Sequence, residues 1–588
     1  MLGKRTRSAG SGESVTEQKV PFAGFRPVEH AVVSPFLDAP SPNQHDTAHL
    51  RVLPPVVPTP NGFTIPVAAP FPNSQYAPPA TYVASGQPSA PSMTVATSIT
   101  NAISTDQHAS EASSPMQTAS SLGSSMLITA AIGFALQIFA SKVLGPDETG
   151  RVGTAEGVAA ICLGLLSLGF DTYVRKEVAV RPSHAKEFVP GAIVVRALLS
   201  IPVAILVAVL LPVFGKPAKV VAIFLVFALA KFVTQTNEML AACLHAVGRV
   251  KGVATQNLVS KLCGAITLLG LIAANRGGIS LPIGVLVGEA VKLVYLAKRT
   301  GAELGVWSRI GDQEIRPVLK RSLPFISTVL ITSFTMFLDV TLLGFLVSDR
   351  EVGYYRFGQQ LVMIAYMVGT VLPWVVLPLA SRAAAQSKSM FEGVARKSIE
   401  AALILSTPVA LMVFLHADTI VKLADQKYLP TIGSLRVISV MIPVTYLASL
   451  GSTLLQAQGR MWIIVRVGIA VAILDGILVF LTARWGLSHF GKGGAGIVAA
   501  WAMLFAEGLG TLVLLTCLGR HLWNREIAVS MARTVGCMLP VVLIEFVLRR
   551  AGVPGVVRIV IEGLLLLANG FLLRLVDTAK IKSFLPGR

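Results

Sequence analysis

Long apolar runs constrain the fold of this chain more than any other feature of its sequence. From Ser121 onward, stretches of about 20 apolar residues recur, and each is long enough as a helix to cross a bilayer core of about 30 Å. Only 14% of the residues are charged, whereas about 25% is usual in soluble globular proteins. Together with a mean hydropathy of +0.67, this predicts an all-α polytopic membrane protein.

Fourteen transmembrane helices are predicted, as two six-helix lobes followed by two further helices. The spans are placed at 121–144, 154–172, 189–213, 218–244, 253–273, 278–298, 322–347, 358–381, 398–418, 432–456, 463–483, 494–518, 529–549 and 555–576. The domain prediction is a tail over 1–120, an N-terminal lobe over 121–300, an inter-lobe loop over 301–321, a C-terminal lobe over 322–520, and the additional helices and short C-terminus over 521–588.

The segment 1–120 differs in composition from the rest of the chain. It holds half of the 34 prolines and is rich in Ser, Ala and Thr. Such a segment buries too little apolar surface to offset its ordering entropy, so it is predicted to be disordered. Two interpretations remain open, namely a cytoplasmic docking tail and a dispensable extension, which includes a start codon assigned too early.

Lys and Arg are spread over the short loops between spans, and this spread indicates orientation. If the N-terminus is cytoplasmic, the loops on that side carry about twice as many basic residues as the opposite loops. Both termini of this multi-pass membrane protein are therefore predicted to be cytoplasmic. The net charge is +19, but the basic residues form no block and do not alternate with aromatic residues. Nucleic acid is therefore not an expected partner.

Two short patterns recur at similar distances along the chain. "LHAVGR" ends the fourth span and "LQAQGR" ends the tenth, with Gly248 and Gly459 separated by 211 positions. "ETG" at 148–150 follows the first span and "EVG" at 351–353 follows the seventh, at an offset of 203. These echoes predict one six-helix unit used twice, related in parallel by an axis along the membrane normal, with the glycines ending their helices.

Several longer stretches resemble one family. They are "LGPDETGRVGTAEGVA", "LGFDTYVRKEVA", "DVTLLGFLVSDREVGYYRFGQQLV", "KYLPTIGSLRVIS" and the two "LxAxGR" ends. In this order they resemble the Wzx-type polysaccharide flippases of the multidrug/oligosaccharidyl-lipid/polysaccharide exporter superfamily, over about 121–580. The resemblance implies a MATE-like fold that moves an undecaprenyl-diphosphate-linked oligosaccharide across the inner membrane, for exopolysaccharide or O-antigen-type export. Membrane lipids and other polysaccharide-assembly proteins are the further partners it implies.

Ionisable residues inside the spans are costly, which makes them candidates for a cavity between the lobes. Lys231, Gln235 and Glu238 follow one another at i, i+4 and i+7, so they share one face of the fourth span. Glu289 and Lys292 at i, i+3 predict an intrahelical salt bridge. The full set of predicted cavity residues is Arg196, Lys231, Gln235, Glu238, Lys261, Glu289 and Lys292. These cations either attract a diphosphate or pair with neighbouring acids and only hold the helices together.

Three residues are candidates for a gate or for ion coupling: Asp339, Arg356 and Glu238. Asp339 and Arg356 lie near the outer ends of the seventh and eighth spans, where they either pair as an outer gate or extend to the membrane surface. The remaining lone acids of late spans are interpreted as structural, and these are Asp475, Glu507, Glu545 and Glu562.

The sequence favours a transporter over an enzyme. It has no nucleophile–base pair, no D-x-D and no phosphate-binding P-loop, and its outer loops are short, which disfavours a glycan polymerase or ligase. A multidrug exporter and a peptidoglycan-precursor flippase of the same fold remain alternatives. No catalytic residue, bound cofactor or metal is predicted, because the five cysteines and nine histidines lack metal-site spacing. Coupling to an H+ or Na+ gradient is a hypothesis.

Overall fold

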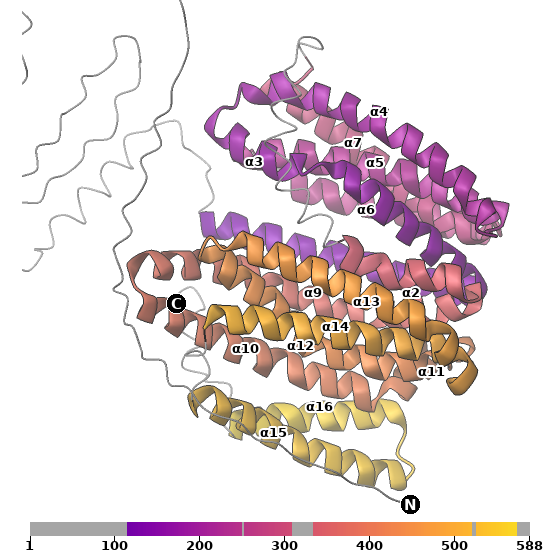
Figure 1. Cartoon of the computed structure of the whole chain (residues 1–588), viewed down its shortest axis with the longest axis vertical. Coiled ribbons are helices and arrows are strands. Elements are labelled where there is room, and N and C mark those ends of the chain that lie inside the picture. Colours follow the sequence, from indigo (N-terminus) through magenta and orange to yellow (C-terminus); the bar gives the residue numbers. More distant parts are fainter. Residues whose placement is uncertain (1–114, 250–251, 308–332, 520–524, 573–588) are drawn as a thin grey trace, which may run out of the picture. The chain divides into compact units, whose positions relative to one another are not determined.

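The structure is a computed structural model that describes residues 115–249, 252–307, 333–519 and 525–572. The predicted tail lies outside these residues except for its last few positions, as do most of the inter-lobe loop and the start of the seventh span. Within the described residues every regular element is a helix (Figure 1). Nine helices in this part of the chain have the length and hydropathy of a membrane span. The all-α membrane fold is thus confirmed, and the number of fourteen spans stays a prediction.

The first six predicted spans correspond to five long helices and one short one. They are α2 (Pro115–Gly164), α3 (Phe170–Val180), α4 (His184–Val213), α5 (Ala218–Ala246), α6 (Val253–Ala273) and α7 (Ser280–Leu304). The element α2 covers both of the first two predicted spans, but it consists of two helices that meet at Gly145, where a φ of 78° before Pro146 breaks the helix next to the predicted end of the first span. The second span ends early, since Leu168 and Gly169 adopt left-handed conformations that start α3 in a new direction.

The second half of the chain supplies the remaining helices. They are Ser333–Leu346, α9 (Asp349–Gln386), α10 (Lys388–Leu415), α11 (Ala417–Ala424), α12 (Thr431–Ala457), α13 (Met461–Phe490), α14 (Gly494–Leu518), α15 (Arg525–Arg550) and α16 (Gly555–Leu572). Buried apolar side chains form two clusters within 140–306 and a third within 340–515. The helix α2 packs closely against α9 as well as α5, so it joins the two halves (Figure 1).

The repeated "LxAxGR" corner has the same geometry in both halves. Gly248 and Gly459 have φ angles of 72° and 73°, which a residue with a side chain rarely adopts. The next amide returns to the helix in both cases, from Arg249 to the Leu244 carbonyl and from Arg460 to the Leu455 carbonyl, each at 2.9 Å. The prediction that these glycines end α5 and α12 is confirmed, and the paired bonds are those of a Schellman-type C-cap.

The loops that follow the odd-numbered predicted spans meet at one end of the helices, called here the odd-loop end. Lys219 and the Gly278 amide both reach Glu148 in the first loop, at 2.7 and 3.0 Å. The same loop contacts the seventh through Asp349 and the ninth through Tyr428. Since alternate loops of a membrane bundle must share a side, these contacts agree with the predicted alternation of spans.

Candidate functional site

Four ion pairs close the odd-loop end between the two halves of the chain. Arg151 reaches Asp349 at 3.0 Å, and Lys216 reaches the same carboxylate at 3.6 Å. Arg350 pairs with Asp147 at 2.7 Å, and Arg356 pairs with Glu156 at 2.6 Å. Each pair joins a residue of the first half to one of the second. The odd-loop end is therefore closed in this conformation.

The repeated glycines of "ETG" and "EVG" allow the two halves to approach at this end. A Cβ on Gly150 would lie 2.6 Å from the Asp349 carbonyl carbon, and a Cβ on Gly353 would lie 2.7 Å from the Pro146 carbonyl carbon. At the offset of 203, Pro146 corresponds to Asp349 and Gly150 corresponds to Gly353. In each half, therefore, the glycine meets the residue of the other half that corresponds to the glycine's own neighbour four positions earlier. This reciprocity is what a two-fold axis between duplicated units produces.

The glutamates of the same two motifs also have equivalent partners. Glu148 accepts the Gly278 amide and Glu351 accepts the Gly493 amide, both at 3.0 Å. Each carboxylate thus holds the turn between the last two spans of its own half. Burial alone would raise the pKa of Glu148, but hydrogen bonds from Lys219, the Gly278 amide and Arg151, together with the Lys219 charge, lower that pKa below its ordinary value overall.

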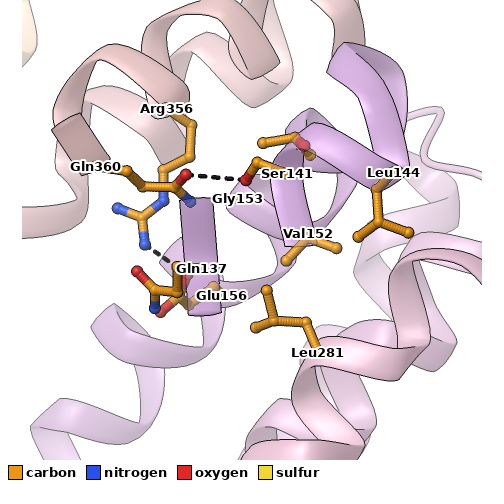
Figure 2. A pocket seen from close by; sticks show the side chains of 10 residues that line it. Gln137, Ser141, Leu144, Val152, Gly153, Glu156, Leu281, Arg356 and Gln360 are labelled. Atoms are coloured by element: carbon orange, nitrogen blue, oxygen red, sulfur yellow. Dashed lines mark hydrogen bonds and ion pairs between the residues drawn. The ribbon is translucent and has the colours of Figure 1, made fainter. Parts of the chain in front are cut away.

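Below the odd-loop end, α2 and α9 enclose only a small polar cavity (Figure 2). Its volume is about 10 Å³, which is roughly the space that one water requires. Ser141 donates to Gln360 at 2.9 Å across it, and the Glu156–Arg356 pair forms another wall (Figure 2). This part of the interface is sealed, so it is not a binding site for a large substrate in this conformation.

Two cations from different halves contact one aromatic ring. The Lys231 ammonium nitrogen lies 5.5 Å from the centre of the Phe337 ring, and the Arg356 guanidinium carbon lies 5.7 Å from it. Such contacts are weakly attractive and hold cations in place without neutralising them. Both side chains are only partly buried. The arrangement places Lys231 and the Glu156-paired Arg356 together at the junction of the halves, beside the sealed interface.

The pairing of Asp339 with Arg356 as an outer gate is wrong. Arg356 pairs with Glu156, whereas Asp339 accepts a hydrogen bond from Tyr355 and is 3% exposed. The reason is the direction of the helices: successive residues on α9 point to different sides, so Tyr355 faces the C-terminal core while Arg356 faces α2. Sequence reasoning missed Glu156, although it lies in the quoted stretch after the first span.

Glu238 lies in a charged interior of the N-terminal half. Its side chain is exposed to solvent, yet the charges of Lys231, Lys292, Asp171 and Glu289 all act on it. This exposure and these neighbouring charges indicate a polar region of the N-terminal half that water can reach. Lys261, with 44% of its side chain exposed, and the partly buried Lys292 add cations to this region.

Arg196 and Gln235, both predicted to line the cavity, are instead buried structural residues. Arg196 is 0% exposed, donates to the Ser167 carbonyl at 2.9 Å and lies 3.7 Å from Asp171. Gln235 donates to the Leu163 carbonyl at 2.8 Å. The irregular segment at the end of α2 exposes the carbonyl groups that these side chains satisfy, which the helical spacing of the sequence does not reveal.

The predicted salt bridge between Glu289 and Lys292 is replaced by contacts between helices. Glu289 is buried, lies 3.9 Å from Lys261 on α6, and accepts a 2.9 Å hydrogen bond from Asn237 on α5. Asn237 also donates to the Glu289 backbone carbonyl at 2.8 Å. Glu289 therefore links α5, α6 and α7, and Lys292 remains partly exposed in the polar region around Glu238.

Acidic residues of the C-terminal half gather around Asp339 rather than standing alone. Asp475 on α13 lies within hydrogen-bonding reach of Asp339, and Glu507 on α14 lies close enough for its charge to interact with both. One carboxylate oxygen of Asp339 and one of Asp475 are buried without a hydrogen-bond partner. The interpretation of Asp475 and Glu507 as lone acids is thus wrong. The cluster could not be predicted from the sequence, because Asp475 and Glu507 lie far apart along the chain and on two different helices.

Comparison with known proteins connects this architecture to one superfamily. A family model described as "Polysaccharide biosynthesis protein" matches residues 140–432. The fold is similar to an inward-facing multidrug resistance MATE family transporter of the MOP superfamily, with 15% identity, a TM-score of 0.54, and coverage of 66% of this chain and 94% of that one. It is also similar to the lipid II flippase MurJ in an inward closed conformation, with 16% identity, a TM-score of 0.51, and coverage of 75% and 99%.

A third solved structure agrees with these two. The eukaryotic MATE transporter AtDTX14 has 14% identity, a TM-score of 0.51, and coverage of 71% of this chain and 98% of that one. No curated protein matches the sequence. At these identities the structures demonstrate the fold alone, and the matched family model adds the polysaccharide branch. The family model and the fold together support the resemblance drawn from the sequence, to a Wzx-like flippase of the multidrug/oligosaccharidyl-lipid/polysaccharide exporter superfamily.

Proposed function

We propose that this protein translocates an undecaprenyl-diphosphate-linked oligosaccharide across the bacterial inner membrane by alternating access. The observation that carries the proposal is the junction of the halves, where Lys231 and Arg356 flank Phe337 directly below a closed odd-loop end. A cationic region closed at one end is what a carrier of an anionic lipid requires in one of its two states. The polysaccharide family match supports the glycan.

The closed end supports alternating access because its contacts can separate without disrupting either half. The four ion pairs between the halves lie near the odd-loop end, while the apolar clusters lie within each half. Rocking of one half against the other then exchanges ion pairs for water and leaves each core packed. In the proposed orientation, with both termini cytoplasmic, the odd-loop end faces outward and this conformation is an inward-facing one.

The charged groups fit a diphosphate on a lipid carrier. Lys231, Lys261, Lys292 and Arg356 supply four cations that remain partly exposed. Charge-assisted hydrogen bonds from Lys and Arg are among the stronger polar contacts with phosphate oxygens. A hollow built mainly from apolar side chains fits a hydrophobic drug better, so these cations favour the lipid-linked glycan over the multidrug exporter.

Coupling to an H+ or Na+ gradient is proposed to occur at the Asp339–Asp475–Glu507 cluster. Two buried carboxylates within hydrogen-bonding reach cannot both be charged without a proton or cation between them. Their unpartnered oxygens offer the place for it. Because Tyr355 bonds to Asp339 and adjoins Arg356 in α9, loading of the cluster is linked by one helical segment to the interface between the halves.

The test is lipid flipping in vesicles that contain the full-length protein and a fluorescent undecaprenyl-diphosphate oligosaccharide. Externally added dithionite bleaches outer-leaflet label, so the rate of further bleaching reports translocation. Lys231→Ala and Arg356→Ala are expected to slow translocation by about tenfold or more, since a hydrogen bond to a charged group contributes about 1.5–3 kcal/mol.

Lys427→Ala is the matched control, because Lys427 is an exposed cation in the loop before α12. It is expected to translocate at the wild-type rate. Unimpaired translocation by Lys231→Ala and Arg356→Ala would overturn the cavity assignment. Transport of a cationic dye instead of the lipid would overturn the proposed substrate and favour the exporter.

A further inference from the structure

A buried polar cluster links the last two helices to the rest of the bundle. His416 follows the end of α10, Glu545 lies on α15, and Glu562 lies on α16. Their exposed fractions are 0%, 5% and 0%. No local pattern in the sequence indicates this cluster, because the histidine precedes the two glutamates by more than a hundred residues and shares no motif with them.

The three side chains have the atoms and spacing of a ligand set. The His416 Nε2 lies 2.9 Å from a Glu562 carboxylate oxygen, and one ligand atom from each of the three residues lies within 4.8 Å of the others. The second carboxylate oxygen of Glu562 and one of Glu545 are buried without a hydrogen-bond partner. Buried polar atoms in folded proteins nearly always have a partner, so these oxygens indicate a bound positive group.

The charges near the cluster do not balance. Arg558 bonds to the other oxygen of Glu545 and neutralises one carboxylate. Glu562 meets the His416 ring and the Glu545 carboxyl group and lies near the same Arg558 charge. Asp418, two residues beyond His416, has a further buried oxygen without a partner. Arg549 lies 3.9 Å from Asp418 but is 57% exposed, so water screens its charge. With a neutral imidazole, three carboxylates and one buried guanidinium leave two negative charges.

A divalent cation removes this imbalance and satisfies the unpartnered oxygens. One imidazole nitrogen and two carboxylates are a ligand set for Zn²⁺ or a related divalent transition metal, whereas Ca²⁺ and Mg²⁺ prefer oxygen ligands alone. In a tetrahedral zinc site the ligand atoms are roughly 3.3 Å apart. The side chains therefore close around the ion by rotamer adjustments of about 1 Å, and Arg558 remains as an outer partner that orients Glu545.

We propose that His416, Glu545 and Glu562 bind a divalent transition-metal ion, with zinc the best-matched class, which fastens α15 and α16 to the end of α10. This inference is independent of the transported substrate. Among the described helices, α15 and α16 pack mainly against each other and α10 (Figure 1). Lipid supplies no hydrophobic force that drives helices together, so polar or metal links stabilise such a pair.

The experiment measures zinc in the purified full-length protein. The protein is depleted of metal with a chelator, incubated with ZnSO₄, desalted, and analysed by mass spectrometry for zinc per chain. The wild type is expected to retain zinc stoichiometrically and to gain thermal stability. His416→Ala and Glu562→Gln are expected to lose zinc to background. Glu400→Gln is the matched control, since it removes an acid of α10 far from the cluster.

Cobalt substitution gives a readout that does not depend on the variants. Co²⁺ bound by His416 and two carboxylates is expected to show visible d–d bands without the sulfur charge-transfer band of a cysteine site. Absence of stoichiometric zinc from the wild type, or equal zinc in the wild type and His416→Ala, would overturn the proposal. If His416→Ala does not fold, the absence of cobalt bands from the wild-type protein overturns the proposal by itself.

Discussion

Adding one methyl group at Gly150 is expected to open the odd-loop end. In Gly150→Ala the new Cβ would lie 2.6 Å from the Asp349 carbonyl carbon, whereas ordinary contacts begin at 3.4 Å. The two segments must separate by at least the difference, about 0.8 Å. The Arg151–Asp349 bond then lengthens from 3.0 Å to about 3.8 Å, which is too long for a hydrogen bond.

The size of the effect follows from the cost of overpacking. An extra methyl group in a packed contact costs about 1–3 kcal/mol. The cost applies only to the state in which the odd-loop end is closed, because the contact is absent once the halves separate. The ratio of closed to open protein is therefore expected to fall by about 5- to 150-fold. Gly353→Ala is expected to lower the same ratio, since its Cβ would meet Pro146 in the equivalent contact of the other half.

Cysteine cross-linking measures the closed state directly. Asp147 and Arg350 have side chains that bond at 2.7 Å, but cysteine is much shorter than arginine. Cysteines at the two positions are therefore joined with a short bifunctional maleimide, and the reaction in membranes is expected to be rapid and to slow when Gly150→Ala is added. The five native cysteines are all free and lie in helices, so background is low. Gly133→Ala on α2 is the matched control, since its Cβ would meet nothing within 4 Å.

Equal cross-linking rates with and without Gly150→Ala would refute this reasoning. That result would mean that the halves accommodate the methyl group without separating, and the contact at Gly150 would then play no part in closing the transporter. A slower rate in Gly133→Ala as well would show that any added side chain on α2 loosens the interface, which also contradicts a specific role for the repeated glycine.

Three further predictions concern other parts of the molecule. Asp475→Asn is expected to abolish the response of lipid flipping to an imposed ion gradient, measured in vesicles with and without the gradient. The pKa of Glu148 is lowered in the folded protein, so the stabilisation from its contact with Lys219 is present above pH 4.5 and lost as the pH falls below that value; a Glu148→Gln variant should therefore differ from the wild type in thermal unfolding above this pH and approach it under more acidic conditions. Tyr428→Phe is expected to destabilise the protein by about 1–3 kcal/mol, read from thermal unfolding, because the hydroxyl donates to the buried Ser141 carbonyl at 2.7 Å.

Most of the fold follows from local patterns in the sequence. Apolar runs of membrane length predict helices because each backbone group must be satisfied within its own segment. The echoes at Gly248 and Gly459 predict helix ends because a left-handed backbone favours glycine. The structure confirms the helical fold and these two ends. The first span was predicted to end at 144, next to the break at Gly145, whereas the helix that resumes directly after this break, before the predicted start of the second span at 154, was missed.

The candidate site was predicted less well, for a physical reason. Spacing along one helix shows which side chains share a face, but a costly buried charge takes its partner from whichever helix lies beside it. Glu289 thus contacts Lys261 and Asn237 on two other helices instead of Lys292. Lys231 is partly exposed, as its polar neighbours on a wet helix face led us to expect, and its lining of a cavity stays a prediction.

The sequence by itself determined the class of protein, the helices and the duplication, because hydropathy, glycine conformation and repeats act over short stretches of chain. Only the tertiary structure decided which charges meet. It placed Glu156 against Arg356 between the halves, and it gathered Asp339 with Asp475 in the C-terminal half. The same holds for His416, whose glutamate partners lie on the last two helices. Which charged residues become partners depends on which helices lie side by side, and no local pattern in the sequence encodes that arrangement.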